Sequence, residues 1–181
     1  MSDLKESFNT NDDDYGNFGG ASWLGQTFTT TSAYTITSVK LKMFKSGSPG
    51  TLTIRIRATS GTYPVTPDLC IGTIDPTTFT TNTAGDWYEI TFGAGAPLTD
   101  ATVYGITANY DSTSGTVGWR RNFNSGLYAG GKAVVSDTSG GDGTWADSVA
   151  GNTDDMFETW GTVGGGAVAK KVPKLLVLGV D

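Results

Sequence analysis

Apolar and polar residues alternate along many short stretches of this chain. Within residues 36–44, Val39, Leu41 and Met43 fall on one side of an extended backbone, with serine and lysine on the other. The same period of two recurs in residues 51–58, 87–92 and 102–108. Strands are predicted at residues 23–29, 36–44, 51–58, 69–74, 87–92, 102–108, 117–120, 132–135 and 156–160. Short strands with turn residues between them predict an all-β fold, an antiparallel β-sandwich.

The remaining segments divide the chain into a body and a tail. Residues 8–22 are polar and acidic and are interpreted as a loop or weak strand, and Gly61, Pro64 and Pro67 mark a long loop. We expect a β-sandwich domain over residues 1–160, a Gly-rich linker over 161–171 and a C-terminal strand or docking tail over 172–181. The apolar run of this tail consists of Leu175, Leu176, Val177 and Leu178. A strand behind a flexible linker can add to a sheet of a neighbouring molecule, so a homo-oligomer is predicted.

Composition and charge narrow the classes of function. Gly accounts for 26 of the 181 residues, which suits many tight turns. The net charge of −6 argues against binding to nucleic acid. Cys70 is the only cysteine, so neither an intrachain disulfide nor a cysteine-ligated zinc site is available. Residues 1–6 have no apolar signal-peptide segment, and no stretch reaches the ~20 apolar residues of a membrane helix, so we expect cytoplasmic synthesis and no membrane insertion.

A series of short motifs carries a resemblance to a known family. The motifs are Gly25-Gln26-Thr27-Phe28-Thr29, Ile36-Thr37-Ser38-Val39-Lys40-Leu41, Gly47-Ser48-Pro49-Gly50-Thr51-Leu52-Thr53-Ile54, Trp87-Tyr88-Glu89-Ile90-Thr91-Phe92, Tyr104-Gly105-Ile106 and Tyr128-Ala129-Gly130-Gly131. Across residues 8–160 this series resembles the choice-of-anchor type of β-sandwich domain, which occurs on bacterial surface proteins and in phage structural proteins. The resemblance implies a jelly-roll-like sandwich and a role outside the cell or in a virion. Since residues 1–6 lack a signal-peptide pattern, we favour the phage particle by analogy.

Two functions from different classes follow from this resemblance. The first is a non-enzymatic phage virion structural protein, a capsid decoration or tail-associated protein, which acts by assembly with other copies of itself and with other virion proteins. The alternative is a carbohydrate-binding module or adhesin that recognises cell-surface glycans. The chain has no histidine, which excludes Ser-His-Asp and Cys-His catalysis. A glycosidase needs only two carboxylates, and Glu89 is the first candidate, although its alternating neighbours suit a solvated strand face.

Two acidic segments are candidate ligands for a structural calcium ion. Calcium prefers several oxygen ligands, and carboxylate clusters supply them. The candidate ligands are Asp12, Asp13, Asp14, Asp154 and Asp155. The first and last strands of a sandwich often lie near one another, so these segments could meet. The alternative is a pair of solvated acidic loops.

Two further sets of residues are candidates for binding. Glycan binding requires exposed aromatic rings with hydrogen-bonding neighbours, and the best set consists of Trp119, Arg120, Arg121 and Tyr128. The alternative is that Trp119 fills the core. A basic stripe on two successive strands is a candidate interface; it consists of Lys40, Lys42, Lys45, Arg55 and Arg57. Its alternative is a solvated face whose charges discourage aggregation.

Overall fold

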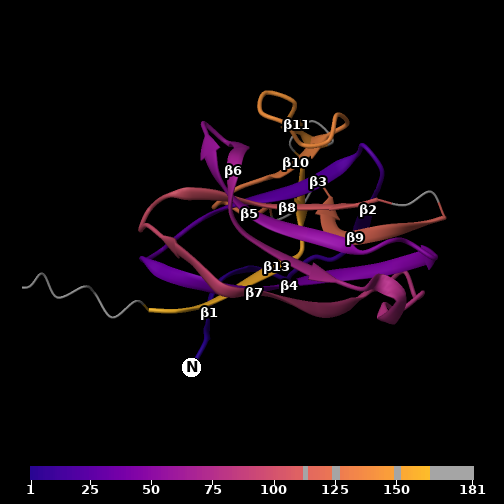
Figure 1. The fold of residues 1–181 in the computed structure, drawn as a ribbon, viewed down its shortest axis with the longest axis horizontal. Coiled ribbons are helices and arrows are strands. Elements are labelled where there is room, and N and C mark those ends of the chain that lie inside the picture. Colours follow the sequence, from indigo (N-terminus) through magenta and orange to yellow (C-terminus); the bar gives the residue numbers. More distant parts are fainter. Residues whose placement is uncertain (112–113, 124–126, 149–151, 164–181) are drawn as a thin grey trace, which may run out of the picture.

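The chain folds into a sandwich of two antiparallel β-sheets, which confirms the all-β prediction (Figure 1). The structure, a computed structural model, describes all residues except 112–113, 124–126, 149–151 and 164–181. The first sheet contains β1 (Asp3–Phe8), β2 (Asp14–Phe18), β4 (Tyr34–Gly47), β7 (Asp86–Leu98), β9 (Gly115–Phe123), β12 (Thr153–Asp155) and β13 (Phe157–Thr162). The second sheet contains β3 (Trp23–Thr29), β5 (Leu52–Ser60), β6 (Tyr63–Ile74), β8 (Val103–Tyr110), β10 (Ala133–Ser136) and β11 (Ala146–Asp147). The described residues include a short 3₁₀ turn, η1 (Pro76–Thr78), and no helix among them is long and apolar enough to cross a membrane.

The long strand β4 organises the first sheet. It pairs with β13 over its first half, with β7 along its other edge and with β9 near its end. On the far side of β13 lies β1, so the beginning of the chain runs beside the last described strand (Figure 1). The second sheet has the order β11-β10-β3-β8-β5-β6, which leaves β6 as its outermost strand.

The core lies between the sheets and is formed by the inward side chains of alternating strands. The inward positions that the sequence predicts in β4 and β5 are fully buried, and they are Val39, Leu41, Met43, Leu52, Ile54 and Ile56. Full burial of each such side chain stabilises the fold by about 1.5–3 kcal/mol. On the outer face of the same sheet, packing depends on Gly118, which lies opposite Phe44, because a Cβ at that position would collide with the Phe44 ring.

A smaller apolar cluster lies on the outer face of the second sheet. It consists of Trp23, Val134 and Trp145. Gly25 lies beneath the Trp145 ring, where a Cβ would come within 3.4 Å of the indole. The segment between β10 and β11 therefore closes over part of this face.

Three segments differ from the sequence-based expectation. β1 was not predicted, and β2 takes the weak-strand alternative that the sequence left open for residues 8–22; such strands need few inward apolar residues, here Phe8 and Phe18. β6 begins at Tyr63 and includes both prolines of the predicted loop, which an outermost strand tolerates because its free edge needs no amide donors. The body continues to Thr162, two residues past the predicted boundary, since β13 pairs with β4 as far as Thr35.

Candidate functional site

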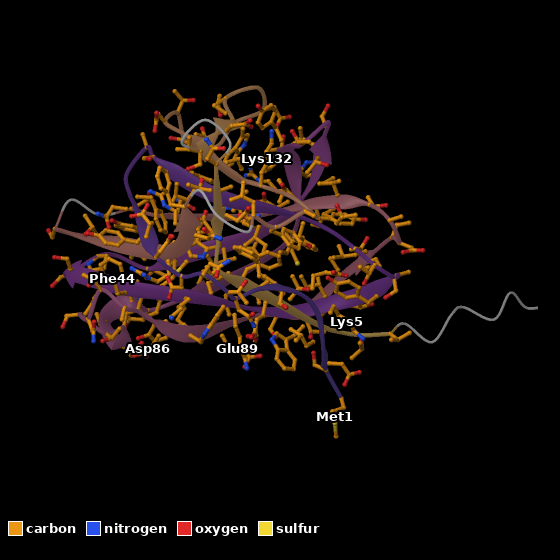
Figure 2. All side chains as sticks on the ribbon, turned by 180° about the vertical axis from the view of Figure 1, so that it is seen from behind. Met1, Lys5, Phe44, Asp86, Glu89 and Lys132 are labelled. Carbon is orange, nitrogen blue, oxygen red and sulfur yellow. The ribbon has the colours of Figure 1, made fainter. Side chains whose placement is uncertain are left out.

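The outer face of the first sheet carries an ordered set of side chains, which we call the tryptophan face. Its members are Leu4, Lys40, Trp87, Glu89, Glu158 and Trp160. They come from the neighbouring strands β1, β13, β4 and β7, which together span about 14 Å. Leu4 lies opposite Trp160, and Trp87 lies opposite Lys42. Leu4 and Trp87 expose 46% and 36% of their surface. Glu89 points away from the sandwich on the free side of the layer (Figure 2).

A row of charges separates the two tryptophans. Lys40 lies opposite Glu158 on one side and Glu89 on the other, so the charges alternate across three strands. The Lys40 ammonium is 4.5 Å from the centre of the Trp160 ring, and the indole Nε1 donates to Glu158 at 3.0 Å. Glu89 accepts a hydrogen bond from the Ser38 hydroxyl at 2.8 Å. Charges on a solvated face interact weakly with one another, so this row offers donors and acceptors to a ligand at little cost to the fold.

A second exposed feature lies on the other sheet. Leu69 and Ile71 project from the same side of β6 and expose 39% and 51% of their surface. We call these two residues the aliphatic pair. β6 is the outermost strand of its sheet, and exposed apolar side chains on such a strand favour association with another protein.

The residues predicted to bind glycans do not form an exposed platform. Trp119 is fully buried and its Nε1 donates to the Met156 carbonyl oxygen at 2.8 Å, so its ring cannot stack on a sugar. Tyr128 is partly buried and packs against core aromatic rings. Arg120 and Arg121 are adjacent in β9 and so point to opposite sides of the sheet. The glycan assignment of this set is corrected: Trp119 takes an inward position of its strand and fills the core.

The two acidic segments lie on either side of β9, next to its arginines. Asp12, Asp13 and Asp14 lie beside one edge of this strand, and Asp154 and Asp155 lie on β12 along the other. Arg121 is opposite Asp14 on one side and Asp155 on the other, and its Nε contacts Asp14 at 2.9 Å. Arg120 contacts Asp12 at 2.6 Å. In the described part of the chain, no group of three acidic, cysteine or histidine side chains is arranged to hold a metal, and calcium binding stays a prediction.

Asp155 is a buried carboxyl group without a hydrogen-bond partner among the described residues. Both of its oxygens are shielded from solvent. The adjacent Asp154 is also buried, but it accepts hydrogen bonds from Gln26 Nε2 at 2.8 Å and from the Tyr128 amide at 2.9 Å. Burial raises the pKa of Asp155 to about 8 against the attraction of Arg121, and repulsion from neighbouring aspartates adds to the rise. Asp155 is therefore mainly protonated at neutral pH.

The predicted basic stripe is divided between the two sheets. Its lysines lie on β4 of the first sheet and its arginines on β5 of the second, and the members are Lys40, Lys42, Lys45, Arg55 and Arg57. The turn after β4 carries the chain across the sandwich instead of forming a hairpin, so no single stripe exists. Arg55 and Arg57 both contact Asp68, at 3.2 and 2.5 Å, and Lys42 contacts Asp12 at 2.5 Å. Arg57 lies with Arg55 on the outer face, as predicted, but it is buried there because the segment between β10 and β11 covers it, and it donates to the Gly140 carbonyl oxygen at 2.6 Å.

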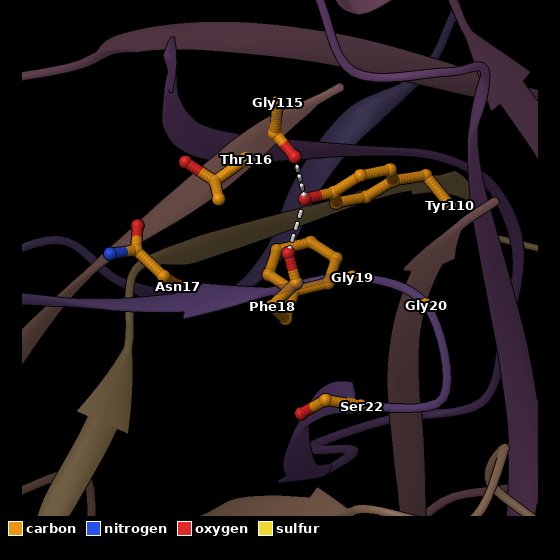
Figure 3. Close-up of a pocket in the computed structure, with 8 residues that line it drawn as sticks. All are labelled: Asn17, Phe18, Gly19, Gly20, Ser22, Tyr110, Gly115 and Thr116. Carbon is orange, nitrogen blue, oxygen red and sulfur yellow. Dashed lines mark hydrogen bonds between the residues drawn. The ribbon is translucent and has the colours of Figure 1, made fainter. Parts of the chain in front are cut away.

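Two open pockets are lined mainly by small residues and backbone. The larger, of about 330 Å³, lies where β2 ends and includes Tyr110 (Figure 3). The Tyr110 hydroxyl is within hydrogen-bond distance of the carbonyl oxygens of Phe18 (2.5 Å) and Gly115 (3.1 Å). In the second pocket, of about 310 Å³, the Thr29 hydroxyl donates to the Gly130 carbonyl oxygen at 2.7 Å. These hydroxyls stabilise the backbone around the pockets.

No protein-family model and no curated protein matches this sequence. The resemblance to the choice-of-anchor family therefore stays a prediction, whereas the β-sandwich is shown by the structure. The strand predicted around Leu175, Leu176, Val177 and Leu178 lies outside the described residues, so both the strand and its docking stay predictions.

The sequence analysis did not identify the tryptophan face, although part of the signal was present. The alternation in residues 87–92 places Tyr88, Ile90 and Phe92 on one side, which leaves Trp87 and Glu89 on the solvent side. A tryptophan among outward polar residues is an unusual position and indicates a possible contact surface.

Proposed function

We propose that this protein is a non-enzymatic structural component of a phage virion, a capsid decoration or tail-associated protein that acts by assembly. Its partners are other copies of itself and other virion proteins. The observation that carries the proposal is the aliphatic pair on β6. Two neighbouring aliphatic side chains, 39% and 51% exposed on the outermost strand of a sheet, lower the free energy of a complex when a partner covers them.

The architecture around the aliphatic pair suits a rigid building block. Arg55, opposite Ile71 on the adjacent strand β5, is held by Asp68 and by the ring of Trp23, whose centre is 4.5 Å away. Because these side chains are fixed within the protein, a partner that docks on β6 orders few additional groups. Association costs less conformational entropy under these conditions.

Light scattering tests the assembly proposal directly. Ile71→Asp places a charge in the contact and should reduce the mass of the wild-type oligomer, while Thr81→Asp adds the same charge to an exposed loop and should leave the mass unchanged. Circular dichroism of each variant checks that the sandwich is intact. The proposal would be refuted if the wild-type protein is monomeric at all concentrations and mass spectrometry does not detect it in purified phage particles.

A further inference from the structure

We infer that the tryptophan face is a binding site for a neutral polysaccharide chain. The first support is the pair of indoles on this side of the sheet, of which Trp87 is 36% exposed and Trp160 is partly buried, with the Lys40 ammonium over its ring. Sugar rings have apolar faces that stack on aromatic rings, and tryptophan offers the largest such surface. Trp87 and Trp160 lie on strands on either side of β4, opposite Lys42 and Ser38 respectively. Strand geometry therefore separates their Cα atoms by about 17 Å, a distance that suits an oligomeric ligand and exceeds a single sugar.

The polar groups between the indoles match the hydroxyl groups of a sugar. Glu89 and Glu158 supply acceptors, and Lys40 between them supplies donors. A hydroxyl group both donates and accepts, so it can use each member of such an alternating row. A purely apolar partner would leave these three charges without water and without new hydrogen bonds, which is unfavourable.

The shape and charge of the face select the class of glycan. The face belongs to four neighbouring strands of an open sheet, and the two pockets described above lie elsewhere, so it suits an extended chain. Two of the three charges in the row are negative and the whole protein carries −6. Acidic glycans would be repelled, and neutral polysaccharides are favoured.

This inference does not depend on the assembly proposal, because the aliphatic pair lies on the other sheet. Native affinity electrophoresis with hydroxyethyl cellulose, laminarin or galactomannan in the gel should retard the wild-type protein in at least one case. Polygalacturonate, an acidic polysaccharide, should not retard it. Trp87→Ala should weaken the retardation about tenfold or more, which is typical of a central aromatic contact. Trp87→Phe keeps an aromatic ring and should retain most of the binding.

Thr73→Ala is the matched control, since it shortens an exposed side chain on the opposite sheet and should leave retardation at the wild-type level. Melting temperatures of all variants check the fold. The inference is overturned if none of the three neutral polysaccharides retards the wild type, or if Trp87→Ala binds as the wild type does. A Trp87→Ala variant that loses self-association without any effect on polysaccharide would instead make this face an interface between copies.

Discussion

Replacing Asp155 by asparagine should stabilise the protein increasingly as the pH rises from acid to weakly alkaline values. The wild-type carboxyl group is fully buried and neither oxygen has a hydrogen-bond partner among the described residues. Arg121, its cross-strand neighbour, donates to Asp14 instead. Ionisation of Asp155 therefore places a negative charge in a site that does not solvate it. Asparagine has a similar shape and carries no charge at any pH.

The magnitude follows from the pKa. Burial raises the pKa of Asp155 from 3.8 to about 8 in the folded protein. At about 1.36 kcal/mol per unit, the proton-linked change in stability is on the order of 5 kcal/mol. Because the folded state keeps its proton while the unfolded chain releases it, this contribution is complete below about pH 4 and is lost as the pH rises to about 8. Within that window the wild type should lose up to about 1.4 kcal/mol per pH unit relative to Asp155→Asn.

Urea unfolding from pH 4 to pH 9 measures this difference. The pH dependence is the readout, since the asparagine amide adds a constant offset from its own unsatisfied groups. The raised pKa of Asp154 is present in both proteins and largely cancels in the difference. Asp100→Asn, at an exposed turn, is the matched control and should follow the wild type. A wild type that gains stability with pH relative to Asp155→Asn would show that Asp155 is ionised and paired in the folded state.

Four further predictions concern packing, hydrogen bonding and binding. Gly118→Ala should destabilise the protein by about 1–3 kcal/mol in urea unfolding, because the new methyl group collides with Phe44, whereas Gly141→Ala meets nothing closer than 3.7 Å and should be nearly neutral. Tyr110→Phe should cost about 1–3 kcal/mol, since it removes a buried hydroxyl that donates to the Phe18 carbonyl oxygen and accepts from the Val117 amide; an unchanged unfolding midpoint would contradict this. If calcium binds between the two acidic segments, it should raise the melting temperature and EDTA should reverse the rise; equal melting temperatures would remove the calcium prediction. Truncation after Val163 should lower the oligomer mass in light scattering if the tail strand docks on a neighbour, and an unchanged mass would exclude that role.

The sequence predicts the sheets well because burial imposes a period of two on each strand. Val39, Leu41 and Met43 occupy the core as the alternation requires. The polar N-terminal segment was the exception, since β1 and β2 lie at sheet margins where few side chains face inward. The prolines of β6 led to an incorrect loop prediction for the first half of that strand. The free edge of a sheet does not need every amide hydrogen, so it accepts proline.

The candidate sites were harder to predict because they depend on which strands are neighbours. Lys42 and Arg55 are close in sequence but belong to different sheets, so the basic stripe does not exist. Trp87 and Trp160 are far apart in sequence but share one face through their pairing with β4. The alternation of apolar and polar residues predicts which side of a strand a residue occupies. Only the register between strands determines which residues of other strands lie beside it.

The pairing of β1 with β13 has a consequence for the synthesis of this protein. The amide of Glu6 donates to the Thr159 hydroxyl, a contact between residues 153 positions apart in the chain. At a translation rate of about 5–20 residues per second, β1 remains unpaired for roughly 8–30 s until its partner strand has been synthesised. During that interval the edge of β4 that β13 later covers is also open. The sandwich therefore closes only after translation has passed residue 162, and the charges of Asp3, Lys5 and Glu6 help keep the waiting strand from aggregating with other nascent chains.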